Sequence, residues 1–268
     1  MNLGIIGGGA MGEAIIASVI RNQVAEPTAI KVYDVATLRL HYLRQTYAVE
    51  TAADAAEAVH DAGLVLLAVK PQEFEKAARA IGSIGDATAV SIMAGVPIAR
   101  IGKLLGTPSV VRAMPNTPAQ IGEGMTVWTA TYDVDETARA AARSIFAALG
   151  EEAFVPDEKY LDMATALSGS GPAYVFLFIE ALVDAGVHIG LSRDLASTMA
   201  LQTVLGSARY AEETGKHPGE LRNQVTSPGG TTAAALRALE AGGFRADILE
   251  AVIAAYERSR ALGEGEAK

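Results

Sequence analysis

Residues 3–12 run Leu-Gly-Ile-Ile-Gly-Gly-Gly-Ala-Met-Gly, and this stretch decides how the rest of the chain is interpreted. A short apolar run leads into glycines spaced G-x-G-x-x-G, and an Ala- and Ile-rich segment follows. The first glycine permits a tight turn, the second lets backbone N–H groups approach a pyrophosphate, and the third lets the helix pack closely on the sheet. The pattern therefore predicts a dinucleotide-binding loop, the alternative being a glycine turn without a ligand. The residues predicted to contact the cofactor there are Gly7, Gly8, Gly9, Ala10, Met11 and Gly12.

Downstream of this loop, short apolar runs alternate with Ala-rich amphipathic stretches. The runs cover residues 3–7, 30–33, 64–69, 89–93, 109–112, 126–129 and 153–155. Such alternation is typical of a parallel sheet with crossover helices, and the run 64–69 is apolar throughout, as a strand buried on both faces should be. From Tyr160 onward the pattern is helical. We predict an α/β doubly wound, Rossmann-type domain over residues 1–157, followed by an all-α domain over residues 158–268.

Asp34 ends the second apolar run, at about the 20-residue distance from the glycines expected of a carboxylate that binds the ribose hydroxyls. Because a carboxylate repels a 2′-phosphate, we expect NADH to be favoured over NADPH, although Lys31 and Arg39 could weaken the preference. The alternative is that Asp34 only caps the next helix.

Two further turns should face the cofactor, because ligands of open parallel sheets bind beyond the carboxyl ends of the strands. One comprises Ala68, Val69, Lys70 and Pro71, and the other begins with Met93 and Ala94. Lys70 is predicted to bond the ribose or the carboxamide of the nicotinamide half, the alternative being a solvated loop lysine.

The second half contains two clusters of hydroxyl residues and glycines, at 168–172 and 226–232, and each opens a predicted helix. Backbone N–H groups and hydroxyls at the positive end of a helix make a receptor for a carboxylate, whereas the alternative is N-capping alone. Predicted helices cover residues 172–190, 193–215, 220–225, 232–241 and 246–262, with Ser192 as an N-cap. Their apolar faces exceed what one small bundle can bury, so we predict an obligate oligomer.

Composition excludes several classes of function. The chain has no Cys, and its formal net charge of −9 comes without a basic run, so nucleic acid and anionic membrane surfaces are poor partners. The N-terminal residues lack the pattern of a secretory signal, and the longest uncharged run, 163–179, is interrupted by glycines and a proline and is too short for a bilayer. We expect a cytoplasmic protein with no metal site, in which His188 and His217 are structural or solvated.

The sequence resembles the pyrroline-5-carboxylate reductases, the last enzymes of proline biosynthesis, along essentially its whole length. The segments that carry the resemblance, besides the glycine loop, are 68–71, 114–118 (Met-Pro-Asn-Thr-Pro), 167–174 (Leu-Ser-Gly-Ser-Gly-Pro-Ala-Tyr) and 218–240. The resemblance implies a Rossmann-type domain and a helical domain that interlocks with its twofold mate. It also implies active sites that use residues of two subunits.

The resemblance assigns roles to individual residues. Thr232 corresponds to the threonine whose hydroxyl approaches the substrate ring nitrogen, Gly230 and Thr231 to backbone donors for the carboxylate, and Glu158 to an acidic residue near the substrate. Ser168, Ser170, Gln224, Ser227 and Gly229 are further expected substrate contacts, and Asn116 is an expected cofactor contact. Three positions depart from the family pattern. Asp34 and Ala55 stand where NADPH-preferring members often carry a neutral or basic residue and an Asn, and Gln224 stands where some relatives have Asn.

The implied reaction is hydride transfer from NAD(P)H to the C=N carbon of 1-pyrroline-5-carboxylate, which gives L-proline. One alternative is a β-hydroxyacid or imine dehydrogenase, but the hydroxyacid enzymes normally use a lysine on the first long helix of the second domain, and residues 172–190 contain none. The other alternative is a non-catalytic NAD-binding protein, in which the hydroxyl clusters are only helix caps.

Overall fold

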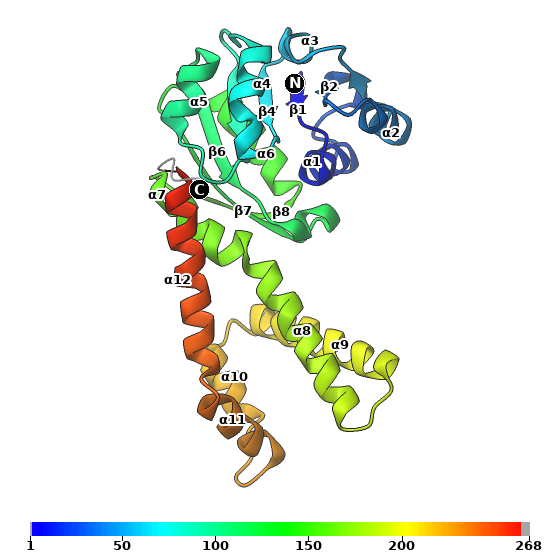
Figure 1. Cartoon of the computed structure of the whole chain (residues 1–268), viewed down its shortest axis with the longest axis vertical. Helices are drawn as coiled ribbons and strands as arrows, with labels where there is room; N and C mark the ends of the chain where they lie inside the picture. Colours follow the sequence, from blue (N-terminus) through cyan, green and yellow to red (C-terminus); the bar gives the residue numbers. More distant parts are fainter. Residues whose placement is uncertain (1, 264–268) are drawn as a thin grey trace. The chain divides into compact units, whose positions relative to one another are not determined.

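The computed structural model describes residues 2–263, which form two compact units (Figure 1). The first unit runs to Ser170 and takes in the chain again from Ala255, and the second is Gly171–Ala254. This division lies later in the chain than the boundary after residue 157 expected from composition. The reason is that helix α7 (Lys159–Ala164) buries Leu161 and pairs Asp162 with Arg112 of the sheet, so it belongs to the first unit.

The first unit is built on one eight-stranded sheet with strand order β3-β2-β1-β4-β5-β6-β7-β8. Its strands are β1 (Leu3–Ile6), β2 (Ile30–Tyr33), β3 (Glu50–Thr51), β4 (Leu64–Leu67), β5 (Thr88–Ser91), β6 (Val110–Met114), β7 (Gly124–Ala130) and β8 (Gly150–Phe154). This confirms the predicted doubly wound fold. One pair departs from the parallel pattern that the alternation indicates. Strand β7 is antiparallel to β6, because the connection between them holds only the short turn η3 (Thr117–Ile121), whereas a parallel crossover needs a dozen or more residues.

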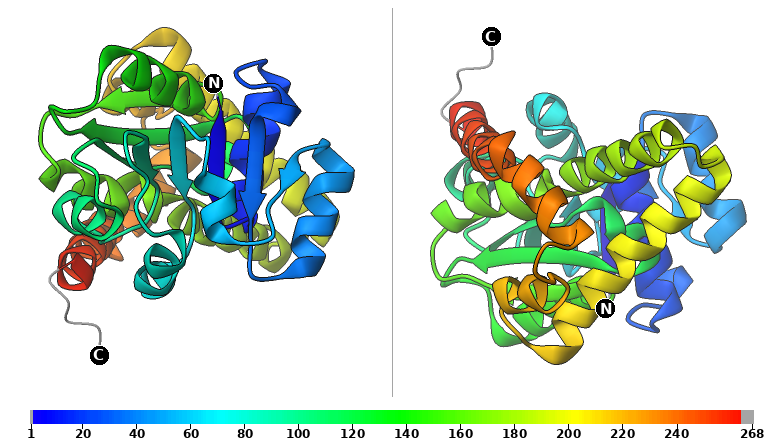
Figure 2. Two further views of the ribbon diagram at one scale, coloured as in Figure 1. Left: turned by 90° about the horizontal axis from the view of Figure 1, so that it is seen from above. Right: turned by 90° about the horizontal axis from the view of Figure 1, so that it is seen from below.

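Helices cover both faces of this sheet (Figure 2). On one face, α1 (Ala10–Arg21), α2 (Thr37–Tyr47) and α6 (Glu136–Ala147) pack into an apolar cluster that includes Ile15, Leu43 and Phe146. On the other face, α3 (Ala55–Val59), α4 (Phe74–Ile81) and α5 (Ile98–Leu105) pack into a cluster that includes Phe74 and Ile101. Each large side chain buried in this way contributes roughly 1.5–3 kcal/mol. The strand order turns back between β1 and β4, the position at which ligands bind in such sheets.

The second unit is helical, as predicted. Its elements are α8 (Gly171–His188), α9 (Arg193–Thr214), α10 (Pro218–Gln224), α11 (Thr231–Ala241) and the first half of α12 (Phe244–Gly263). Ser192 caps α9 by accepting the N–H of Leu195 at 3.4 Å. His217 caps α10 by accepting the N–H of Gly219 at 3.0 Å on Nδ1, which is a structural role.

The second unit buries little of its apolar surface. Its buried hydrophobic cluster consists of Val183, Ala196 and Ala200, while Phe176 and Leu177 are 62% and 66% exposed. The helical stretch Lys159–His188 is long and apolar enough to cross a membrane by length and composition, a test that the core helix of a soluble protein also passes. An apolar face of this size marks a surface that another protein or a membrane covers.

Candidate active site

The glycine loop at the end of β1 leaves room for a ligand at one position. Gly7 has φ +104°, and a Cβ there would lie 2.6 Å from the carbonyl oxygen of Ala68. A Cβ on Gly12 would lie 2.2 Å from the carbonyl oxygen of Gly7. These two glycines are therefore required by the packing of the protein itself. A Cβ on Gly9 would have no atom within 4 Å, so the backbone is open beside the N-terminus of α1, where a pyrophosphate binds in this fold.

A cleft of about 440 Å³ begins at this loop. The predicted residues that line it are Gly7, Gly9, Asp34, Ala68, Val69 and Lys70. Gly8, Ala10, Met11, Gly12, Pro71, Met93, Ala94 and Asn116 are not among its lining residues. Ala55 also lines it, as do Glu73 and Lys76, which the sequence analysis missed. A cation near the start of the helix that follows Lys70-Pro71 was the available signal for Lys76.

Asp34 accepts two backbone hydrogen bonds, one from the glycine loop and one from the residue before α2. Its Oδ2 accepts the N–H of Gly8 at 2.7 Å, and its Oδ1 accepts the N–H of Ala36, the residue before α2, at 2.9 Å. These bonds fix the carboxylate at the carboxyl end of β2, where it lines the cleft. Asp34 thus fixes the turn before α2 and contributes a carboxylate to the lining of the cleft.

The two cations expected to offset Asp34 do not line its cleft, although Arg39 bonds the same glycine as Asp34 does. Lys31 lines a separate cavity of about 120 Å³, together with Gly4 and Asp61. Arg39 donates from Nε to the carbonyl oxygen of Gly8 and forms an ion pair with Glu13. Neither cation lines the cleft that contains Asp34.

Asn116 connects the turn after β6 to the segment that precedes α8. Its Oδ1 accepts the N–H of Met125 at 2.9 Å, and its Nδ2 donates to the carbonyl oxygen of Ser168 at 3.0 Å. Ser168 lies in η4 (Thr165–Gly169), a π-helical turn of the kind that is frequent at functional sites. The Ser168 hydroxyl donates to the carbonyl oxygen of Ala164 at 3.0 Å, and the N–H of Ser170 donates to that of Thr165 at 2.8 Å. Asn116 therefore positions the Ser168 segment, using both ends of its amide.

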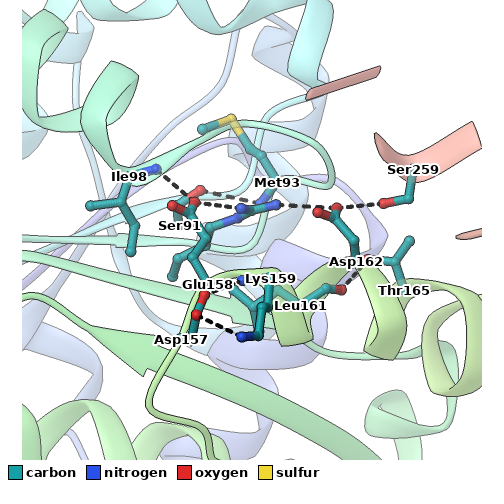
Figure 3. A network of polar contacts seen from close by, with 11 residues as sticks. Ser91, Met93, Ile98, Asp157, Glu158, Lys159, Leu161, Asp162, Thr165 and Ser259 are labelled. Atoms are coloured by element: carbon teal, nitrogen blue, oxygen red, sulfur yellow. Dashed lines mark hydrogen bonds and ion pairs between the residues drawn. The ribbon is translucent and has the colours of Figure 1, made fainter. Parts of the chain in front are cut away.

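Glu158 belongs to a polar network that the sequence did not reveal (Figure 3). Its Oε1 accepts from Nη1 of Arg112 at 2.5 Å and from the N–H of Ile98 at 2.8 Å. The Arg112 side chain is only 5% exposed, and its Nη2 lies 4.0 Å from Oδ1 of Asp162, which also accepts the Ser259 hydroxyl at 2.7 Å. Glu158 thus neutralises a buried arginine, although it also lines a cavity of about 340 Å³. The available signal for Arg112 was a charge inside the apolar strand Val-Val-Arg-Ala-Met.

In the second unit, the bend 226–232 presents an uncapped helix end. Gly229 has φ +69°, and the N–H of Gly230 donates to the carbonyl oxygen of Ser227 at 3.1 Å, which closes the turn. Gly230 precedes α11 without any side-chain cap, and the first helical bond runs from the N–H of Ala234 to the carbonyl oxygen of Gly230. Within residues 2–263, the hydroxyls of Thr231 and Thr232 have no hydrogen-bond partner. N-capping by a side chain therefore does not account for this cluster.

Two of the residues assigned here by resemblance are engaged inside the protein. The N–H of Gly230 is used by the turn itself, which leaves the N–H groups of the first turn of α11 as the open donors. Gln224 donates from Nε2 to Glu220 Oε1 at 3.2 Å within α10. Gln224, Ser227 and Gly229 are all exposed.

The sheet, the glycine loop and the carboxylate at the end of β2 define the first unit as the cofactor domain of a dinucleotide-dependent oxidoreductase. Residues 2–95 match a family model described as NADP oxidoreductase coenzyme F420-dependent, and residues 158–262 match one described as pyrroline-5-carboxylate reductase dimerisation. The chain belongs to the pyrroline-5-carboxylate reductase family.

Individual relatives support this assignment over the full length. The chain is 46% identical to a pyrroline-5-carboxylate reductase of Synechocystis sp. over 98% of this chain and 99% of the relative. A crystal structure of Plasmodium falciparum pyrroline carboxylate reductase with NADP bound has a TM-score of 0.90 and 32% identity, covering 98% of both chains. The structure of a pyrroline-5-carboxylate reductase from Coxiella burnetii has a TM-score of 0.89 and 38% identity, covering 97% of this chain and 98% of the other.

Proposed function

We propose that this chain reduces 1-pyrroline-5-carboxylate to L-proline with NAD(P)H, the last step of proline biosynthesis. The observation that carries the proposal is the uncapped N-terminus of α11, with the unpartnered hydroxyls of Thr231 and Thr232, in a chain whose other unit contains the dinucleotide cleft. Full-length similarity to reductases of this name supports the substrate.

The first unit binds the cofactor through residues that the cleft already brings together. The open backbone at Gly9 and the N-terminus of α1 hold the pyrophosphate, and Asp34 bonds the ribose hydroxyls. Lys70 bonds the ribose or the carboxamide of the nicotinamide half. The bound reduced nicotinamide supplies a hydride to the carbon of the C=N bond, whose π electrons move to the ring nitrogen.

The second unit binds the substrate and orients it. Free N–H groups in the first turn of α11, beginning with Thr231, bind the carboxylate at the positive helix end. The Thr232 hydroxyl oxygen accepts a hydrogen bond from the protonated ring nitrogen and holds the ring in position for attack. A hydroxyl can do this without a pKa near 7, because the iminium nitrogen already carries its proton and needs only positioning.

The experiment that tests the proposal follows the oxidation of reduced nicotinamide after addition of 1-pyrroline-5-carboxylate, with NADH and NADPH in parallel. We expect turnover that depends on the pyrroline and yields proline. Binding of either reductant without turnover would contradict the proposal in favour of a non-catalytic NAD-binding protein. Oxidation of 3-hydroxy acids with NAD⁺, in the absence of pyrroline turnover, would point to a hydroxyacid dehydrogenase.

We further propose that NADH is preferred, because the fixed carboxylate of Asp34 lies in the cleft and neither Lys31 nor Arg39 does. Ala55 supplies no polar group at its position. Asp34→Ser should raise the ratio of kcat/KM for NADPH over that for NADH by roughly tenfold, because it removes the repulsion of a 2′-phosphate. Asp86→Ser, which removes an exposed carboxylate on the loop before β5, is the control. An unchanged ratio in Asp34→Ser would remove Asp34 from the account of specificity.

The proposal includes assembly and location. The family description of residues 158–262 and the exposed apolar side chains of the second unit support a homodimer or a dimer-based assembly. In such an assembly the apolar surface of the 159–188 stretch is buried between subunits and not in a membrane. The net charge of −9 without a basic run disfavours nucleic acid as a partner. The proposed location is cytoplasmic, and a chain without Cys fits a reducing compartment.

A further inference from the structure

Gly8 is held from two sides by groups of opposite charge. Its N–H donates to Oδ2 of Asp34 at 2.7 Å, and its carbonyl oxygen accepts from Nε of Arg39. A Cβ built on Gly8 would lie 3.5 Å from Cγ of Arg39 and 3.6 Å from Oδ2 of Asp34. The arginine and the ribose carboxylate are therefore neighbours on one residue of the glycine loop.

Glu13, on the first turn of α1, fixes the far end of this arginine. Its Oε2 pairs with Nη2 of Arg39, while its Oε1 accepts the hydroxyls of Tyr42 at 3.0 Å and Tyr47 at 2.8 Å. The Arg39 guanidinium also lies 5.0 Å from the centre of the Tyr42 ring. Both members of the pair are largely covered, with 26% of the Arg39 side chain and 23% of the Glu13 side chain exposed. The Arg39 side chain thus contacts Glu13 on α1, the Tyr42 ring on α2 and the Gly8 carbonyl oxygen in the loop.

We infer that Glu13 is a specificity-determining residue for the cofactor, and that it acts by withholding Arg39 from a 2′-phosphate. This rests on the proposed function only in that the cleft binds a dinucleotide. A guanidinium beside the ribose site is the group that accommodates a 2′-phosphate in this fold, because it can donate two parallel hydrogen bonds to phosphate oxygens. Glu13 neutralises that guanidinium and holds it against the Gly8 carbonyl. Two carboxylates then disfavour NADPH: Asp34 by repulsion, and Glu13 by keeping the available arginine occupied.

Other cations do not replace Arg39 in this argument. Lys70 and Lys76 line the cleft and are present in every variant considered, so they set a basal affinity for phosphate that cancels when variants are compared. The contribution of Glu13 is therefore measured by the change in affinity for a 2′-phosphorylated ligand, relative to one without the phosphate, that occurs only when Arg39 is present.

The test measures binding of two fragments, adenosine 2′,5′-bisphosphate and AMP, to the full-length protein by isothermal titration calorimetry. Glu13→Gln keeps the shape of the side chain and removes its charge, so we expect the affinity for the bisphosphate relative to AMP to rise about tenfold. Arg39→Met alone should leave this ratio unchanged, because Arg39 is already occupied in the parent protein. The double variant Glu13→Gln/Arg39→Met should lose the gain.

Glu152→Gln is the matched control. Glu152 also pairs with an arginine and an aromatic donor, accepting from Arg143 Nε and Trp128 Nε1, each at 2.6 Å, but it lies on β8 and does not line the cleft. It should leave the ratio of affinities unchanged. If Glu13→Gln does not fold, as judged by circular dichroism, Glu13→Asp weakens the same pair by shortening the side chain and should shift the ratio in the same direction by a smaller factor.

Two results would overturn the inference. Equal weakening of both fragments by Glu13→Gln would show that the residue only shapes the loop, and a gain that persists in the double variant would show that another cation receives the phosphate. Since fragment binding needs no pyrroline, loss of pyrroline reduction would count against the proposed function alone. A shift in the ratio would still support the role of Glu13.

Discussion

The two units of the chain treat their apolar side chains in opposite ways. The first buries large side chains such as Phe74 and Phe146 in two clusters, one on each face of the sheet. The second buries Val183 and two alanines, while Phe176 and Leu177 are exposed. The first unit therefore buries its apolar side chains within one subunit. The second unit has apolar faces that a second copy of the chain is expected to cover.

The largest difference between the two units should be seen when a charge is placed on the exposed face of α8. Leu177→Arg places a charge on a surface that we expect to be buried between subunits, and it should weaken the dimer by about 100-fold or more and abolish most of the activity. Sedimentation at micromolar concentration and the reductase assay measure the two effects. Tyr132→Arg, at a side chain of the first unit that is 99% exposed, should change neither. A dimer unaffected by Leu177→Arg would place the subunit contact on another face.

A smaller effect is expected at the open end of α11. Thr232→Ala removes one hydroxyl from the proposed substrate site and should lower kcat by about 10- to 10³-fold with no change of oligomeric state. Thr231→Ala is the matched control, because only the backbone of Thr231 is proposed to bind the substrate. Steady-state kinetics decide between them, and full activity in Thr232→Ala would reassign the contact to the ring nitrogen.

In the first unit, the polar network around Arg112 should contribute stability that does not depend on a second subunit. Glu158→Gln leaves the buried Arg112 guanidinium without its 2.5 Å carboxylate contact and should lower the free energy of unfolding by about 1–3 kcal/mol. Urea denaturation measures this. Glu75→Gln, in the exposed pair with Arg100, should cost less than about 1 kcal/mol. Equal effects of the two substitutions would mean that the network contributes no more than a surface pair.

The smallest expected effect concerns pH. Burial raises the pKa of Glu152, but hydrogen bonds from Trp128 and Arg143 outweigh it and hold the pKa below its ordinary value of 4.5. Because the folded-state pKa is lowered, the carboxylate stabilises the protein above pH 4.5, and this stabilisation is lost as the pH falls through the folded-state value. Glu152→Gln should therefore reduce the loss of stability between pH 7 and about pH 3 by less than about 1 kcal/mol. Urea midpoints across this range measure it, and an unchanged pH dependence would contradict the prediction.

Local pattern was sufficient to predict much of this fold. Three features are determined by neighbouring residues in the sequence, and the structure has all of them: the glycine loop, the strand within the run 64–69 and the helix capped by Ser192. Family membership and the reductase assignment were likewise predicted from motifs, and the comparisons confirm them. The division at residue 157 stays a prediction, as do the individual site residues.

What could not be predicted depends on contacts between distant segments. The antiparallel β7 follows from the shortness of its connection, and β3 has only two residues, too few for any periodic signal. Arg112 is an unexplained charge in the sequence until its partners 46 and more residues away are known. Similarly, nothing in the local sequence of Asn116 indicates that its amide joins Met125 to Ser168.

Gly95, at φ +70°, packs closely against the end of α12, since a Cβ there would lie 3.1 Å from Cβ of Leu262. Together with the bond from Ser259 to Asp162, this seats the last turns of the chain on the first unit, which the polypeptide left at Ser170. The helical unit is therefore topologically an insertion and not a tail. Truncation after residue 170 would therefore remove part of the first unit, whereas deletion of residues 171–254 alone would keep both of its segments.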